Sequence, residues 1–172
     1  MRREFLEEDI GGFSFREYGE LGRPKYLILG LPDIGLVGSI SAMHIVRSLG
    51  MDDVVGVESY AFLPPVVVVS SGEPRYPMRI YKKDDLAVLV TDVPVSPAGI
   101  APLAMSIVEF ARRRGVELIV SVTGLGSPKR LQGGSPNLYW LASSPNAARV
   151  AEEAGLKEKL EEGILVGPYA II

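Results

Sequence analysis

Three acidic side chains stand where buried strands are expected to end: Asp33, Glu58 and Asp92. In an open α/β sheet, the carboxyl ends of parallel strands gather at one edge, so these carboxylates could meet there. Together they could bind a small ligand or a metal ion, or supply a general base. Asp33 and Asp92 could instead cap the helices that follow them, as short acidic residues commonly do, and we favour capping for these two. No metal site is assigned.

A glycine-rich loop is the second place where a ligand could bind. It follows a strand expected over residues 118–123, contains Gly124 and Gly126, and continues to Lys129 and Arg130. Backbone amides around glycine can form an anion-binding nest, to which the two cations would add charge. The same composition is typical of a mobile surface loop or of a partner-binding edge, which is the interpretation we prefer.

The stretch from Gly30 to Gly38 has the outline of a phosphate-binding loop without its donors. A P-loop needs lysine and then serine or threonine after its second glycine, whereas two apolar residues follow Gly35. A dinucleotide-binding loop needs a glycine where Pro32 stands, and proline has no amide hydrogen to offer a pyrophosphate. We therefore expect Gly30, Pro32 and Gly35 to shape a turn and Gly38 to let a helix approach the sheet, with no cofactor bound.

Composition narrows the class of protein. The chain has 172 residues, of which 47% are hydrophobic and 23% charged, as in ordinary soluble domains. A net charge of −3 gives no general attraction to nucleic acids or anionic membranes. The absence of cysteine excludes disulfides and thiol nucleophiles, and His44 is the single histidine. A charged N-terminus and the lack of a long apolar run predict a cytoplasmic protein, and the scarcity of amide side chains is typical of a thermophile.

Apolar runs and helical spacing predict alternating strands and helices. After an N-terminal hairpin, strands are expected over residues 26–29, 54–58, 66–69, 78–81, 86–91 and 118–123, and helices over residues 36–49 and 97–114. Pro64 and Pro65 introduce the valine run at 66–69, which we expect to be a strand covered on both faces and paired with 78–81. Gly50 and Gly115 stand where glycine ends a helix. Shorter pieces follow: strands at 138–141 and 164–167, and helices at 145–155 and 157–162.

This alternation predicts an α/β fold with a mostly parallel sheet and one antiparallel hairpin. Because no linker or repeat interrupts the pattern, residues 1–172 are expected to form a single α/β domain. The chain ends on the apolar segment of residues 169–172, where a further helix is expected. We therefore predict that C-terminal elements are missing; a terminal strand that tucks into the sheet is the alternative.

Four blocks of sequence, in this order, resemble the proteasome assembly chaperone family in its archaeal branch. They lie at residues 27–50, 60–81, 88–99 and 120–128, and the matching features are the loop Gly30-x-Pro32-x-x-Gly35-Leu-Val-Gly38, the block from Phe62 through the prolines to residue 68, and a hairpin ending in Ile80-Tyr81. The resemblance implies a three-layer α/β/α fold similar to nucleoside phosphorylases but without their chemistry. It also implies a role in holding proteasome α subunits during ring assembly. Relatives are sometimes labelled ATP-grasp enzymes.

Three functional hypotheses result. The first is a non-enzymatic assembly factor, a homo-oligomer that binds proteasome α subunits through the loops at the sheet edge and through the C-terminal part that we expect to be missing. Archaeal relatives can dock through a tail with tyrosine second from its end, and Tyr169 stands too early for that. The second is an ATP-dependent ligase or a nucleoside phosphorylase-like enzyme in which Glu58, Asp92, Lys129 and Arg130 would act. The third is a homo-oligomeric scaffold for some other partner.

Overall fold

The computed structural model describes residues 6–125 and 137–172 of a mixed α/β protein with a mostly sheet core. The chain divides into two compact units, Met1–Gly124 together with Val166–Ile172, and Leu125–Leu165. The single domain expected over residues 1–172 stays a prediction. Within the described ranges, no helix has both the length and the apolar composition needed to cross a bilayer.

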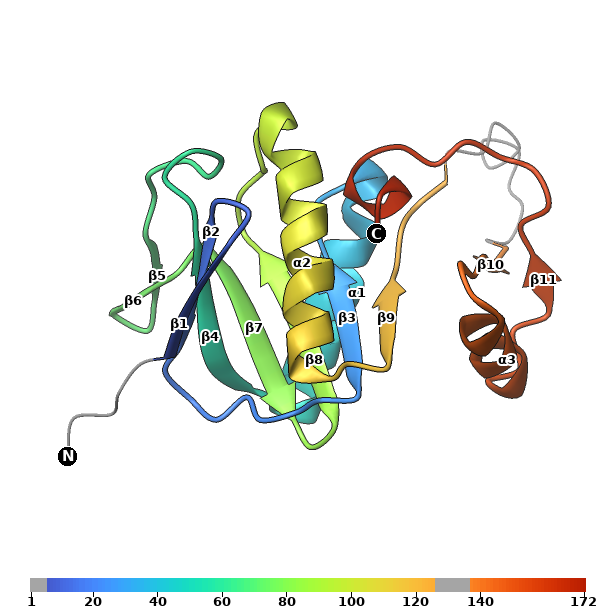
Figure 1. Ribbon diagram of the computed structural model, residues 1–172, viewed down its shortest axis with the longest axis horizontal. Coiled ribbons are helices and arrows are strands. Elements are labelled where there is room, and N and C mark those ends of the chain that lie inside the picture. Colours follow the sequence, from blue (N-terminus) through green and yellow to red (C-terminus); the bar gives the residue numbers. More distant parts are fainter. Residues whose placement is uncertain (1–5, 126–136) are drawn as a thin grey trace. The chain divides into compact units, whose positions relative to one another are not determined.

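A seven-stranded sheet forms the centre of the larger unit (Figure 1). In spatial order its strands are β1 (Leu6–Ile10), β2 (Phe13–Glu17), β4 (Asp52–Glu58), β7 (Met78–Lys83), β8 (Leu86–Thr91), β3 (Tyr26–Gly30) and β9 (Leu118–Ser121). The bounds of β8 are those expected from the sequence, and the N-terminal hairpin is present as β1 and β2.

Most neighbouring strands in this sheet run antiparallel, so the prediction of a mostly parallel sheet is wrong. The pairs β1–β2, β2–β4, β4–β7 and β7–β8 are antiparallel, whereas β3 pairs in parallel with β8 and β9. Tight turns join β1 to β2 and β7 to β8, and β4 lies between these two hairpins instead of beside β3. The order of strands and helices along the sequence does not reveal where such a strand is inserted.

The two long helices end where the sequence predicts. Helix α1 (Val37–Leu49) follows the short helix η1 (Ile34–Leu36), and helix α2 (Ile100–Arg114) follows η2 (Pro97–Gly99). Gly50 and Gly115 adopt the left-handed conformation at the C-caps, with φ of 58° and 72°. In each case the glycine N–H donates to carbonyls of the last helical turn, which satisfies groups that the helix leaves unpaired.

Alternating side chains of the strands feed two core clusters. Along β3, Leu27 and Leu29 join one cluster and Ile28 packs against the other. Side chains of α2 complete the first cluster, together with two stacked pairs of phenylalanine rings that involve β2. Ala42 and Val46 of α1 complete the second, against β8. Because strand side chains alternate between faces, the two helices serve opposite faces of β3.

The valine run is not the buried strand that its sequence predicts. Strand β5 (Val68–Ser70) pairs only with β6 (Glu73–Arg75), in a separate two-stranded sheet, while β7 pairs with β4 and β8. The prolines before the run remove two backbone donors, and Pro74 removes another from β6, so this hairpin cannot extend the main sheet in register. The valines at 66, 67 and 69 remain exposed.

The smaller unit holds α3 (Pro145–Glu153) and the parallel pair of strands β10 (Tyr139–Trp140) and β11 (Glu158–Lys159). Ser144 caps α3 by accepting a hydrogen bond from the Ala147 N–H. The helix predicted over 157–162 is wrong, since β11 lies there, and residues 164–167 form no strand. The last element, η4 (Pro168–Ala170), belongs to the larger unit.

Candidate interaction surface

One edge of the main sheet collects the carboxyl ends of β3, β4 and β8. Strand β8 is parallel to β3, and β4 is parallel to β8 because each is antiparallel to β7. The loops that follow these strands therefore leave from the same edge, in the order of the strands across the sheet. Glu58 is the last residue of β4, and Asp33 and Asp92 lie in the loops after β3 and β8, so all three carboxylates lie at this edge.

The three carboxylates are at the same edge, but each binds a different residue. Asp33 accepts a hydrogen bond from the Thr123 hydroxyl. Glu58 lies 2.7 Å from the Arg16 guanidinium, and Asp92 lies 2.6 Å from that of Arg79. A ligand shared by these carboxylates stays a prediction.

The predicted capping by Asp33 and Asp92 is wrong. Asp33 stands at the N-cap of η1, but its side chain makes no capping hydrogen bond. The N-cap of η2 is Ser96, and Asp92 lies four residues before it, too early in the chain to cap that helix. Lys129, Arg130 and Gly126, the other predicted loop residues, lie outside the described residues.

Close packing at the end of β3 explains two of the loop glycines. A side chain on Gly30 would collide with Ala42 of α1, and one on Gly38 would collide with the Val122 carbonyl oxygen. The same hypothetical Cβ on Gly38 would lie 2.7 Å from the Tyr169 hydroxyl oxygen. Any larger residue would push α1 away from the sheet, so these positions require glycine for space.

Tyr169, from the C-terminal segment, binds the backbone of this loop. The Leu31 N–H donates to the Tyr169 hydroxyl oxygen at 2.7 Å, and that oxygen lies 2.9 Å from the Leu31 carbonyl and 3.3 Å from the Leu29 carbonyl. Burial raises the pKa of Tyr169, the Leu31 bond opposes that shift, and the nearby Asp33 charge adds to it. The tyrosine is therefore neutral at physiological pH. Its hydroxyl oxygen accepts a hydrogen bond from a loop N–H that a phosphate-binding loop would donate to its ligand.

Sequence reasoning missed this contact because it spans 138 residues. The available signal was the apolar C-terminal segment, because the hydroxyl of its tyrosine needs a hydrogen-bond partner if the segment is buried.

The turn between β3 and α1 holds a leucine in an unfavourable backbone conformation. Leu36 has φ of 55°, in the left-handed region, directly after Gly35 with φ of 77°. A residue with a Cβ loses about 1–2 kcal/mol in that conformation, and such strain tends to collect at functional sites. The exposed fractions are 50% for Leu36, 40% for Val37 and 65% for Ile40. These three side chains form what we call the α1 surface.

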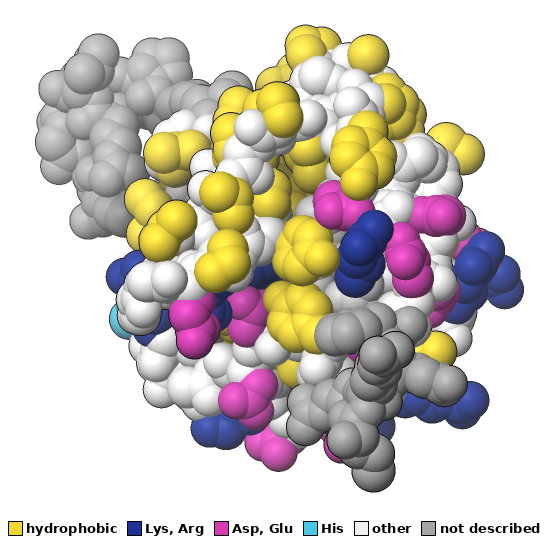
Figure 2. All heavy atoms as spheres, turned by 90° about the vertical axis from the view of Figure 1, so that its left-hand side faces the viewer, with side chains coloured by type: hydrophobic (Ala, Val, Ile, Leu, Met, Phe, Trp, Pro, Cys, Tyr) yellow, Lys and Arg dark blue, Asp and Glu magenta, His cyan; other side chains and the backbone are white. Residues whose placement is uncertain are grey.

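A second apolar group follows β4. From Ser59 to Gly72 the chain carries no charged residue, and within it Tyr60, Val67 and Val69 are more than 60% exposed. Residues 64–70 are called the valine segment from here on. Figure 1 shows β5 and β6 at the left of the sheet, and Figure 2, which faces that side, shows hydrophobic side chains gathered in its upper part with charged ones below.

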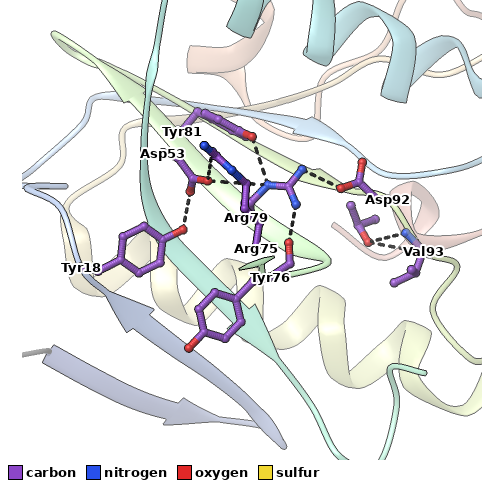
Figure 3. Close-up of polar contacts among 9 residues, drawn as sticks. Tyr18, Asp53, Arg75, Tyr76, Arg79, Tyr81, Asp92 and Val93 are labelled. Atoms are coloured by element: carbon purple, nitrogen blue, oxygen red, sulfur yellow. Dashed lines mark hydrogen bonds and ion pairs between the residues drawn. The ribbon is translucent and has the colours of Figure 1, made fainter. Parts of the chain in front are cut away.

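A polar network fastens the β5–β6 hairpin to the sheet (Figure 3). Arg79 of β7 is only 4% exposed and donates to Asp92 at 2.6 Å, to the Tyr81 hydroxyl at 3.0 Å and to the Tyr76 carbonyl. Burial alone would lower the pKa of Arg79, but the hydrogen bonds and charges around it raise that pKa, so it remains a cation. From β6, Arg75 donates to Asp53 of β4 at 3.1 Å.

Tyr18 extends the network and borders a cavity. Its hydroxyl donates to Asp53, and burial together with that bond raises its pKa. Beside it is an open cavity of about 480 Å³ whose lining holds two arginines and two acidic residues: Arg16, Tyr18, Asp53, Glu73, Pro74, Arg75 and Tyr76. Its charges balance, so the network's visible role is to position the hairpin. No sequence spacing signals it, because its members are brought together by strand pairing.

The sequence matches one family profile and is similar to two known archaeal proteins. The PAC2 family profile matches residues 27–172. The uncharacterized proteins MJ0106 and MJ1210 of Methanocaldococcus jannaschii are 32% identical over 103 residues and 27% identical over 151 residues, which cover 60% and 85% of this chain. The chain spans 43% of the length of MJ0106 and 58% of the length of MJ1210, about half of each relative.

Solved structures share the architecture. A Pyrococcus furiosus protein, PbaA, described as an archaeal homolog of proteasome-assembly chaperone, aligns with a TM-score of 0.73 and 24% identity over 91% of this chain and 66% of its own. PbaB of the same organism, described as an archaeal proteasome activator, aligns with a TM-score of 0.73 and 21% identity over 94% and 73%. These likenesses show a common fold. With its profile matched over most of its length, the chain belongs to the PAC2 family.

Proposed function

We propose that this chain is a non-enzymatic, proteasome assembly chaperone-like protein that self-associates and binds proteasome α subunits. Family membership supports a function of this kind, as do the descriptions of its structural neighbours as a proteasome-assembly chaperone homolog and a proteasome activator. The proposal includes an archaeal, thermophilic source, a cytoplasmic location and the three-layer arrangement of nucleoside phosphorylases. The two core clusters on opposite faces of β3 support that arrangement.

The exposed α1 surface is the observation that carries the proposal. Folding leaves 50% of Leu36, 40% of Val37 and 65% of Ile40 in water, so covering the exposed part would stabilise each by roughly 1 kcal/mol. Leu36 also bears the cost of a left-handed backbone where glycine would bear none. A partner surface that covers these side chains would supply the missing burial. Exposed apolar side chains gathered at one edge are typical of protein-binding sites.

The geometry of the edge gives less support to a ligase or a phosphorylase. A catalytic group of carboxylates needs a common target, whereas Glu58 and Asp92 bind arginines from different strands. A phosphate at the end of β3 would compete with Tyr169 for the Leu31 N–H. We therefore retain surface contact as the mode of action.

Binding to α subunits tests the proposal. The full chain and its Ile40→Asp variant are titrated with purified α subunits from the same organism, and heat or fluorescence anisotropy reports the dissociation constant. A carboxylate forced into an apolar contact costs several kcal/mol unless it finds a partner, so we expect Ile40→Asp to weaken binding by about 100-fold or more. Leu6→Asp is the matched control, since Leu6 is 61% exposed on β1 at the opposite edge. Absence of binding by the full chain would refute the proposal, as would equal affinities of the two variants.

A further inference from the structure

Strand β5 carries neither charge nor proline, unlike the edge strands β1 and β6; β9, the last strand of the main sheet, is likewise uncharged. Exposed edge strands usually carry charges or proline, which discourage pairing with another chain. Strand β1, at the edge of the main sheet, carries Glu7, Glu8 and Asp9, and β6 carries Glu73, Pro74 and Arg75. Strand β5 is Val-Val-Ser and belongs to a stretch of 14 residues, 59–72, without a charge.

Backbone groups of Val69 point toward this open edge. In the antiparallel pair, Val68 faces Arg75, Val69 faces Pro74, and Ser70 faces Glu73. In such a ladder, hydrogen-bonded and non-hydrogen-bonded pairs alternate. Proline has no N–H, so the Val69–Pro74 pair is a non-hydrogen-bonded one. The N–H and C=O of Val69 are consequently directed away from β6, where an added strand could bind them.

A second copy of the same strand satisfies these groups. When two β5 strands run antiparallel with Val69 on the two-fold axis, each Val69 exchanges both backbone hydrogen bonds with its counterpart. The exposed side chains at 67 and 69 lie on one face of the strand; Val69 meets Val69 of the second copy and Val67 lies opposite Ser71, with no charge brought into the contact.

The charges of β6 stay out of the contact in the same arrangement. Ser70 lies opposite Val68 of the second copy, so Glu73 of one β6 is aligned with Arg75 of the other across roughly three strand spacings, about 14 Å, where salt screens them from each other. The contact is also closed, because two-fold pairing uses the outer edge of β5 in both copies and leaves no β5 edge for a third copy.

We infer that β5 is the self-association site of this protein, where two copies pair antiparallel through Val69 to form a continuous four-stranded sheet. This inference rests on the self-association within the proposed function and assigns it a surface. The valine segment follows β4, and the α1 surface follows β3. Strands β7 and β8 lie between β4 and β3 in the sheet, so pairing at β5 leaves the α1 surface available for a different partner.

Because the chain has no cysteine, single substitutions can report the pairing register. In the predicted pair, the two Val69 Cα atoms lie about 5.5 Å apart, within the span that a disulfide bridges. The two Val67 Cα atoms are offset by four residues, about 14 Å along the strands, outside that span. The full chains with Val69→Cys, Val67→Cys and Leu6→Cys are oxidised mildly and resolved on a non-reducing gel, and sedimentation equilibrium gives the mass of the unmodified protein.

We expect a disulfide dimer for Val69→Cys and only background dimer for Val67→Cys and Leu6→Cys. The unmodified protein should associate, and Val69→Lys should reduce its mass to that of smaller species. Equal cross-linking of the three cysteine variants would overturn the inference, as would a monomeric unmodified protein or cross-linking of Val69→Cys to an α subunit instead of to itself. Binding of α subunits by Val69→Lys separates the two proposals, since that binding depends on the α1 surface and persists if only the self-association site is lost.

Discussion

Substituting Leu36 by glycine and by alanine separates the strain of the turn from its exposed side chain. Both variants lose the buried half of the leucine, which costs roughly 1 kcal/mol. Alanine keeps a Cβ in the left-handed conformation at φ of 55°, whereas glycine adopts that conformation without penalty. We therefore expect Leu36→Gly to be more stable than Leu36→Ala by roughly 1 kcal/mol, although glycine gains more freedom on unfolding.

Ile40 supplies the comparison, because it is also exposed but lies within α1. There the usual order applies, and Ile40→Ala should be more stable than Ile40→Gly by about 1 kcal/mol. Urea unfolding followed by circular dichroism measures all four variants. Trp140 lies in the smaller unit, so its fluorescence reports on that unit separately. If glycine and alanine rank in the same order at both positions, Leu36 is not held in the left-handed conformation and the argument from strain fails.

Three further variants test other parts of the account. Tyr169→Phe should destabilise the protein by about 1–3 kcal/mol in urea, because the Leu31 N–H loses its acceptor; an unchanged midpoint would contradict the Tyr169 contact. Arg79→Met should cost about 1–3 kcal/mol, since Asp92 and the Tyr76 carbonyl lose their donor while Asp53 keeps Arg75 and Tyr18, and full stability would show that the network is dispensable. Hydrogen bonds from two arginines lower the pKa of Glu109 from its ordinary 4.5 to about 2, so its contribution is complete above pH 4.5 and is lost as the pH falls toward 2. NMR titration should find that value, and Glu109→Gln should flatten the acid limb of stability; a titration near 4.5 would contradict the ion pairs.

Local signals in the sequence were sufficient for the elements that local chemistry determines. The strand over residues 86–91 and the helix ends at Gly50 and Gly115 follow from apolar runs and from glycine's access to positive φ. The valine run was misread because an uncharged β-branched run is typical both of a buried strand and of an exposed pairing edge. Only the neighbours of a strand distinguish the two.

The site depends on contacts that no local pattern records. Asp53 and Tyr18 are 35 residues apart, and Leu31 and Tyr169 are 138 apart, yet each pair is joined by a hydrogen bond. The sheet edge was expected from the general rule for α/β folds, and it does gather the loops after β3, β4 and β8. The sequence pointed to carboxylates there, whereas the structure exposes apolar side chains and pairs each carboxylate with its own partner.

Amide hydrogen exchange in the presence of proteasome α subunits tests the central claim most directly. If the α1 surface is the docking site, exchange should slow at residues 34–40 when the subunits are added and stay unchanged at the β7–β8 turn on the opposite edge. Slowing confined to other segments, with residues 34–40 exchanging as in the free protein, would contradict the account.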